Sequence, residues 1–95
     1  MWFLYVVLCD DGTLYTGITK NVPKRVSHHN TGKGAKYTRS RLPVRLLAKC
    51  EICDSQSVAL KCEYAFKQLS KKQKLSTIQA GLQQFVNNQR MRMNH

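Results

Sequence analysis

Acidic residues are scarce in this chain. Sixteen lysines and arginines stand against five aspartates and glutamates, which gives a formal net charge of +11. No acid occurs between Asp11 and Glu51, and none follows Glu63. Such a one-sided charge attracts polyanions, because each neutralised phosphate releases counterions. The sequence therefore predicts a nucleic-acid partner, with a plain solvated basic surface as the alternative. A membrane surface is less favoured, since no basic amphipathic helix with bulky aromatic residues is present.

Long apolar runs are also missing, so the sequence predicts no membrane-spanning segment. Residues 1–8 are apolar, but this run is short, lacks a basic leader and has no small-residue cleavage site after it. We therefore expect a cytoplasmic protein with four reduced cysteines. Cys50 and Cys53 have the spacing of a zinc or redox pair. No second Cys/His pair at metal-ligand spacing follows, so we expect them to be small buried residues.

The length of 95 residues is sufficient for one domain with two layers of secondary structure. We expect that domain to span residues 1–87, followed by a frayed basic tail over residues 88–95. Apolar patterns and capping signals predict three strands and three helices. The predicted strands span residues 2–9, 13–19 and 44–53; the predicted helices span residues 21–30, 54–69 and 70–87, the second capped by Asp54 and Ser55. This order predicts an α+β fold with a small three-stranded antiparallel sheet flanked by helices.

The first two strands are expected to form a hairpin that carries two tyrosines, Tyr5 and Tyr15. A two-residue loop would place their phenols on opposite faces of the sheet, because the side-chain period of a strand is two. A three-residue loop of Asp10, Asp11 and Gly12 would pair Tyr5 with Gly17 and place both phenols on one face. We therefore predict the three-residue loop, with Gly12 in a left-handed bulge.

Other residues could join the two phenols in a site. Arg25 and His29 are four apart on a predicted helix, so they share one face. Glu63 lies at the edge of the apolar stripe of the next helix and is the one acid without an evident local role. Each of these residues also has an ordinary structural explanation, such as packing, solvation or a surface ion pair. Composition and periodicity alone indicate a basic α+β module that binds nucleic acid.

The ordered set of Tyr5, Tyr15-Thr16-Gly17, Arg25, His29 and Glu63 resembles the GIY-YIG nuclease superfamily. The similarity covers roughly residues 2–75 and is closest to the small stand-alone bacterial members. It includes the stretches Asp11–Thr19, His29–Thr38 and Arg41–Val44. The resemblance implies three antiparallel strands flanked by helices. It also implies an endonuclease that cleaves phosphodiester bonds with one Mg²⁺ or Mn²⁺ ion, in DNA of branched, damaged or otherwise unusual structure.

By this resemblance, Glu63 would hold the metal and Arg25 would brace the scissile phosphate. Tyr5, Tyr15 and His29 would hold and activate the attacking water, with the residue that takes the proton left open. The family's name-giving glycine and isoleucines are replaced by Phe3, Leu4 and Thr16, positions that we expect to affect packing. We expect nucleic-acid contacts mainly from the glycine-rich basic loop over residues 32–39 and its surroundings. The predicted contact residues are Lys24, Lys33, Lys36, Tyr37, Arg39 and Arg41.

Three alternatives stay open at this point. One is a non-catalytic module that binds RNA or the ribosome, which requires the charge but none of the five candidate residues. Another is a protein-interaction domain that uses the C-terminal helix. The glycine-rich loop could also be a plain basic connector. We expect no small-molecule cofactor.

Overall fold

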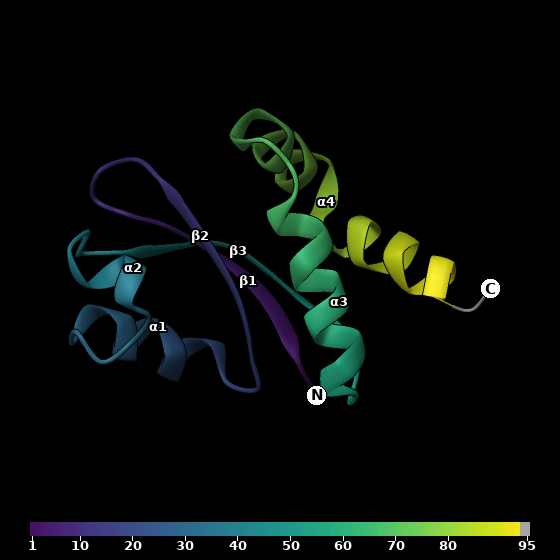
Figure 1. Ribbon diagram of the computed structural model, residues 1–95, viewed down its shortest axis with the longest axis horizontal. Coiled ribbons are helices and arrows are strands. Elements are labelled where there is room, and N and C mark those ends of the chain that lie inside the picture. The colour runs from purple at the N-terminus through teal and green to yellow at the C-terminus, as the bar shows by residue number, and fades with distance from the viewer. Residues whose placement is uncertain (94–95) are drawn as a thin grey trace.

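A computed structural model describes residues 1–93. Its three strands form one antiparallel sheet in the order β2-β1-β3, so the first strand is central. Four helices accompany the sheet, α1 and α2 on one side and α3 and α4 on the other (Figure 1). The strands are β1 (Phe3–Leu8), β2 (Leu14–Thr19) and β3 (Arg45–Glu51); the helices are α1 (Val22–Asn30), α2 (Lys36–Arg39), α3 (Gln56–Lys67) and α4 (Lys71–Met93). The predicted α+β class is confirmed, although the short helix α2 was expected to be loop.

The β1–β2 hairpin has the predicted register. Tyr5 pairs with Gly17, and Val7 pairs with Tyr15. The backbone N–H of Cys9 donates to the carbonyl of Thr13 at 2.8 Å, which closes a loop of three residues. Gly12 in that loop has a φ of 83°, a conformation that favours glycine. Both phenols therefore lie on the same face of the sheet.

The two faces of β1 pack against different helices, because successive side chains of a strand point to opposite faces. Leu4 and Val6 join the larger core cluster beneath α3 and α4, where Phe66 is fully buried. Tyr5 and Val7 join a smaller cluster on the side of α1. The sheet thus separates the larger apolar cluster from a layer that contains a buried phenol.

Two asparagine side chains, Asn21 and Asn30, hold the two ends of helix α1. The side chain of Asn21 accepts a hydrogen bond from the backbone N–H of Lys24, as an N-cap does. At the other end, the Asn30 side chain bonds both the N–H and the carbonyl of Val44, at 2.7 and 2.9 Å. These two bonds fix the last turn of α1 to the start of β3, and so hold the helix face that carries Arg25 and His29.

Helix α3 is capped differently from the prediction. The hydroxyl of Ser55 accepts from the backbone N–H of Val58 at 3.3 Å, so Ser55 is the N-cap. Asp54 is not part of the cap and instead pairs with the terminal ammonium of Met1 at 2.9 Å. This ion pair is solvent-exposed, since the Asp54 side chain is 88% exposed, so it contributes little to stability.

Helix α4 continues beyond the expected end at residue 87 and reaches Met93, with a non-helical glycine, Gly81, at a φ of 119° and ψ of 107°. The prediction of a frayed tail differs from the structure over residues 88–93. Arg90 donates to the carbonyl of Ile52 at 2.9 Å, and Met93 packs against the larger core cluster. These contacts stabilise a last segment that its polar composition does not predict to fold. The remainder of the predicted tail, residues 94–95, lies outside the described part of the chain.

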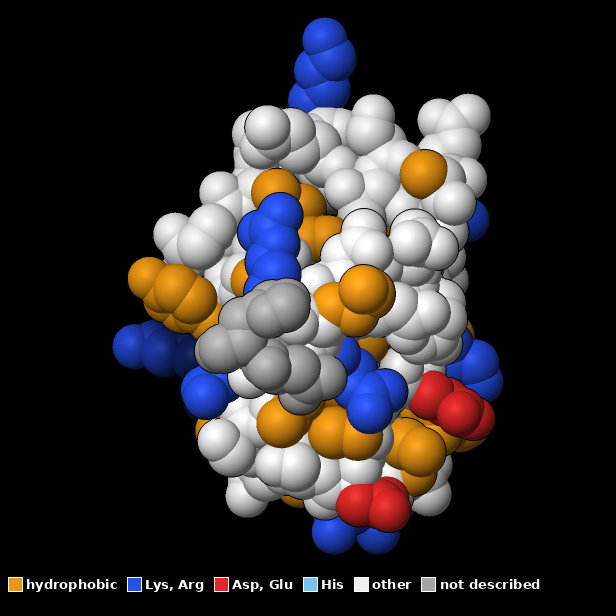
Figure 2. Space-filling view, turned by 90° about the vertical axis from the view of Figure 1, so that its right-hand side faces the viewer, with side chains coloured by type: hydrophobic (Ala, Val, Ile, Leu, Met, Phe, Trp, Pro, Cys, Tyr) orange, Lys and Arg blue, Asp and Glu red, His pale blue; other side chains and the backbone are white. Residues whose placement is uncertain are grey.

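Of the two cysteines that were expected to be buried, Cys50 is buried and Cys53 is only half-buried. All four cysteines are free, and burial raises the pKa of the Cys50 thiol to about 12. Within residues 1–93, no helix has both the length and the apolarity to cross a membrane. Figure 2 views the molecule from the right-hand side of Figure 1 and shows lysine and arginine side chains projecting at several places around this face. The positive charge on this face is therefore spread out and does not by itself locate a site.

Candidate active site

A chain of hydrogen bonds runs from β1 through α1 to α2. The hydroxyl of Tyr5 lies 2.8 Å from Nε2 of His29, and Nδ1 of the same imidazole lies 2.9 Å from the hydroxyl of Thr38. The Thr38 hydroxyl in turn donates to the carbonyl of Ala35 at 2.9 Å. Tyr5, His29 and Thr38 are at most 1% exposed. Buried polar groups of this kind are stable only when they are hydrogen-bonded, and here each one is.

Two glycines make room for this chain. A Cβ atom at Gly17 would lie 2.6 Å from the Tyr5 hydroxyl, and one at Gly34 would lie 2.3 Å from Nδ1 of His29. Neither position tolerates a side chain without displacement of the phenol or the imidazole. Gly17 lies opposite Tyr5 in the sheet, whereas Gly34 comes from the loop between α1 and α2. The need for glycine in that loop is therefore steric, in addition to any contact with a ligand.

Burial favours the neutral forms of both titratable groups in this hydrogen-bond chain, Tyr5 and His29. Burial raises the pKa of Tyr5, and the hydrogen bond and charge of Arg25 offset only part of this effect. Burial likewise lowers the pKa of His29, and the nearby positive charge of Arg25 adds to the decrease. A neutral phenol and a neutral imidazole therefore face each other near pH 7.

Arg25 is anchored to this chain by one bond. Its Nε–H donates to the Tyr5 hydroxyl at 3.3 Å. Within residues 1–93, the guanidinium makes no ion pair and no other hydrogen bond. It is half-buried. Its remaining N–H groups are consequently available to an anion such as a phosphate, which a planar guanidinium can bind in a bidentate manner.

Tyr15 is placed differently from Tyr5. Its ring meets His29 edge-on, with centroids 5.3 Å apart, and stacks on Tyr37 at 6.0 Å. Tyr15 is half-buried, and its hydroxyl has no hydrogen bond within the described residues. The two phenols thus lie on one face of the sheet, yet only that of Tyr15 is open to a water molecule or a substrate.

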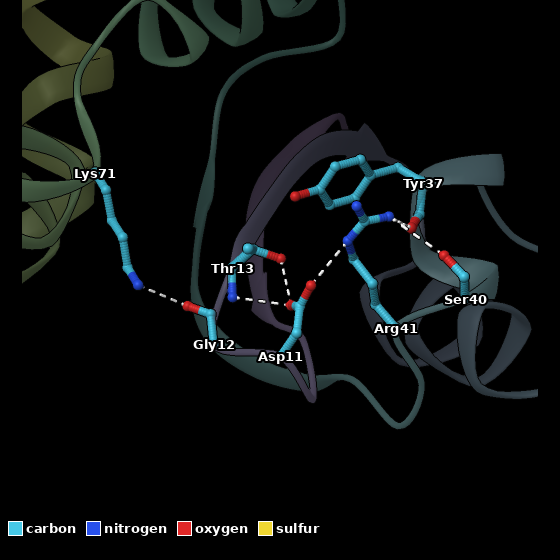
Figure 3. Close-up of polar contacts among 7 residues, drawn as sticks. All are labelled: Asp11, Gly12, Thr13, Tyr37, Ser40, Arg41 and Lys71. Carbon is cyan, nitrogen blue, oxygen red and sulfur yellow. Dashed lines mark hydrogen bonds and ion pairs between the residues drawn. The ribbon is translucent and has the colours of Figure 1, made fainter.

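Tyr37 and Arg41 form a support beside Tyr15. The Arg41 guanidinium lies 3.9 Å from the centre of the Tyr37 ring and bonds the carbonyl of Tyr37. The same guanidinium pairs with Asp11 at 2.9 Å, and Asp11 also accepts from the hydroxyl of Thr13 (Figure 3). Arg41 therefore joins the hairpin loop to α2 and is engaged within the protein, although the sequence places it among the nucleic-acid contacts.

Glu63 lies on α3, which packs against β2, the edge strand that carries Tyr15. Its carboxylate lies 3.7 Å from Nζ of Lys67, and that ammonium lies 5.7 Å from the centre of the Tyr15 ring. The charge of Glu63 also contributes to the raised pKa of Tyr5. Tyr5 thus contacts both His29 and Arg25, Tyr15 contacts the same imidazole, and Glu63 is close enough for its charge to act on Tyr5.

Glu63 is the carboxylate at this position that could bind a metal ion. Among residues 1–93 there is no cluster of three histidines, cysteines or acids that could enclose an ion. Glu63 is 19% exposed and has only the long contact to Lys67 as an ion pair. This fits Mg²⁺, which is commonly held through one or two carboxylates, with waters and substrate phosphates as its other ligands.

The remaining predicted contact residues are solvent-accessible. Tyr37 is 39% exposed, and the basic side chains of α1, α2 and the loop between them are exposed. These basic residues are Lys24, Lys33, Lys36 and Arg39. No pattern in the sequence predicts the roles of Gly34, in the loop after α1, or of Thr38, in α2.

Comparison with known proteins identifies the family. Residues 1–76 match the GIY-YIG catalytic domain. The UPF0213 protein DP2720 of Desulfotalea psychrophila is 54% identical over 80 residues, which cover 83% of this chain and 72% of the relative. The UPF0213 protein YsiG of Lactococcus lactis is 50% identical over 82 residues, which cover 85% of this chain and 78% of the relative.

Two solved structures are also similar. The solution NMR structure of the UPF0213 protein BH0048 from Bacillus halodurans has a TM-score of 0.54 and 40% identity, covering 85% of this chain and 86% of that one. The solution NMR structure of EF2693 from E. faecalis has a TM-score of 0.53 and 38% identity, covering 84% and 85%. The expected family resemblance is thereby confirmed: the chain belongs to the GIY-YIG nuclease family, among the small bacterial UPF0213 proteins.

Proposed function

We propose that this protein is a divalent-metal-dependent endonuclease that hydrolyses phosphodiester bonds in DNA. The observation that carries the proposal is the hydrogen-bonded cluster of Tyr5, Arg25 and His29, with Tyr15 against the same imidazole. Membership of the GIY-YIG family supports a nuclease, and the net charge of +11 supports a nucleic-acid substrate.

Arg25 is proposed to bind the scissile phosphate. Its Nε is held by Tyr5, so its outer N–H groups have a fixed direction and no competing partner within the described residues. Negative charge develops on the phosphate oxygens as the water oxygen bonds to phosphorus and the bond to the leaving oxygen breaks. A preorganised guanidinium stabilises that charge more than it stabilises the ground state.

The phenol of Tyr15 is proposed to orient the attacking water. Tyr15 is half-buried and has an unengaged hydroxyl, whereas Tyr5 is 1% exposed and already bonded to Arg25 and His29. The raised pKa of Tyr5 also makes it a poor proton acceptor at neutral pH. The two tyrosines would therefore have separate roles, one toward the water and one toward the arginine.

Glu63 is proposed to hold the single Mg²⁺ or Mn²⁺ ion. A bound divalent ion supplies a coordinated water of lowered pKa and offsets charge on the phosphate. Lys67, the present partner of Glu63, would be released to meet a phosphate when the ion binds. Two observations support this role: Lys67, the partner of Glu63, lies over the Tyr15 ring, and the charge of Glu63 acts on Tyr5.

The substrate is proposed to be DNA of branched, damaged or otherwise unusual structure. The exposed basic residues of α1, α2 and their loop suit contacts to the phosphate backbone, which position a duplex or a junction without reading its sequence. The free cysteines are in keeping with a cytoplasmic location, where thiols stay reduced.

The test is cleavage of end-labelled single-stranded, duplex and branched DNA, with matched RNA, in Mg²⁺, in Mn²⁺ and in chelator. The proposal predicts metal-dependent cleavage of at least one DNA substrate. If no substrate is cut, the alternative of a non-catalytic binding module gains support, since the net charge of +11 would suffice for binding. In that case Tyr15→Phe would leave binding unchanged.

A further inference from the structure

The Thr38 hydroxyl has one proton and two acceptors at 2.9 Å, the carbonyl of Ala35 and Nδ1 of His29. When that proton goes to Ala35, the contact with Nδ1 uses a lone pair of the Thr38 oxygen, and the imidazole carries its proton on Nδ1. Nε2 then has a lone pair that accepts the proton of the Tyr5 hydroxyl at 2.8 Å.

We propose that Thr38 is a positioning residue that holds His29 in the Nδ1–H tautomer and thereby sets the direction of the whole chain that ends at Arg25. This role rests on the proposed function of Arg25 in phosphate binding. Every donor in the chain then meets an acceptor: Thr38 to Ala35, His29 to Thr38, Tyr5 to His29, and Arg25 to Tyr5.

The opposite tautomer would break this order. With the proton on Nε2, His29 would become the donor to the Tyr5 oxygen. The Tyr5 oxygen would then accept from both Nε2–H of His29 and Nε–H of Arg25, and the proton of its own buried hydroxyl would have no acceptor within the described residues. An unsatisfied buried donor is costly, so the phenol would move to satisfy it and its contact with Arg25 would weaken. The acceptor role of one hydroxyl on α2 is thus coupled to the position of a guanidinium on α1.

The surroundings prevent solvent from replacing Thr38. Both His29 and Thr38 are 0% exposed. Gly34 lies so close to the imidazole that a Cβ atom there would be 2.3 Å from Nδ1. Val, which has the shape of Thr but no hydroxyl, would leave Nδ1–H without an acceptor. Buried donors without partners are costly, so the ring would favour the other tautomer.

The experiment measures the tautomer and the cleavage rate separately. Nitrogen-15 NMR of the imidazole at pH 8, without DNA or metal, distinguishes Nδ1–H from Nε2–H in the wild type, Thr38→Val and Thr38→Ser. We expect Nδ1–H in the wild type and in Thr38→Ser, and a shift toward Nε2–H in Thr38→Val. Under single-turnover conditions, cleavage by Thr38→Val should fall at least about tenfold, while Thr38→Ser stays within about threefold of the wild type.

Two results would overturn the role of Thr38. One is Nε2–H as the main tautomer in the wild type, a measurement that does not depend on whether any variant folds. The other is equal cleavage by Thr38→Val and Thr38→Ser. Absence of cleavage by the wild type would instead refute the proposed nuclease function, and the wild-type tautomer would still decide whether Thr38 orders the chain.

Discussion

Substitution of the two tyrosines by phenylalanine should separate structure from chemistry. Both changes remove one hydroxyl and keep the ring. Tyr5→Phe leaves Nε2 of His29 buried without a donor and Arg25 without its anchor. An unsatisfied buried acceptor costs about 1–3 kcal/mol. Tyr15→Phe removes a hydroxyl with no hydrogen bond within residues 1–93, so its free energy of unfolding should stay within about 0.5 kcal/mol of the wild type.

The measurement is urea and thermal unfolding of both variants, followed by circular dichroism. For a domain of this size, each kcal/mol corresponds to about 4–8 °C in Tm. Tyr5→Phe should therefore unfold at a clearly lower temperature than Tyr15→Phe, while both variants lose cleavage activity. Equal stability of the two variants would refute the reasoning, because it would mean that the hydroxyl of Tyr5 is no better satisfied in the folded protein than that of Tyr15.

Three further predictions follow from the geometry and the charge. Gly17→Ala would place Cβ 2.6 Å from the Tyr5 hydroxyl, so unfolding free energy should fall by about 1–3 kcal/mol and cleavage should fall with it. Because the pKa of His29 is lowered in the folded protein, the unfolded chain binds a proton below about pH 6.5 that the folded chain does not bind. The free energy of unfolding in urea should therefore fall from pH 7 to pH 5. The variant His29→Asn should lose the His29 contribution to this pH dependence. DNA binding should weaken with salt by a log–log slope of about −0.9 per phosphate contacted, and Lys33→Ala should reduce that slope by about one contact if the loop meets the backbone.

Much of the fold follows from local sequence rules. The run of β-favouring residues before Asp10 predicts a central strand. The requirement that Tyr5 and Tyr15 share one face selects a three-residue loop with Gly12 over a two-residue turn. The cap at Asn21 similarly predicts the start of α1. These features depend on residues that are neighbours in the chain, so their physical cause is visible in the sequence.

The features that could not be predicted depend on contacts between distant segments. Residues 88–93 look polar and frayed, yet Arg90 reaches the carbonyl of Ile52 and extends α4. Arg41 looks like a phosphate ligand, but Asp11, thirty residues earlier, engages it. Thr38 carries no distinctive pattern, and its importance appears only once His29 is placed beside it. Chemistry that requires a partner elsewhere in the chain is thus the part that needs a structure.

The central claim is that Glu63 is the carboxylate of a metal-dependent nuclease site. The most direct measurement compares Glu63→Gln with Glu51→Gln, a matched loss of one charge from an exposed strand residue. Rates are measured with Mg²⁺ on a DNA substrate that the wild type cuts. We expect Glu63→Gln to lose cleavage by at least about 100-fold while it keeps DNA binding, and Glu51→Gln to cut like the wild type. Cleavage by Glu63→Gln at the wild-type rate would contradict this claim.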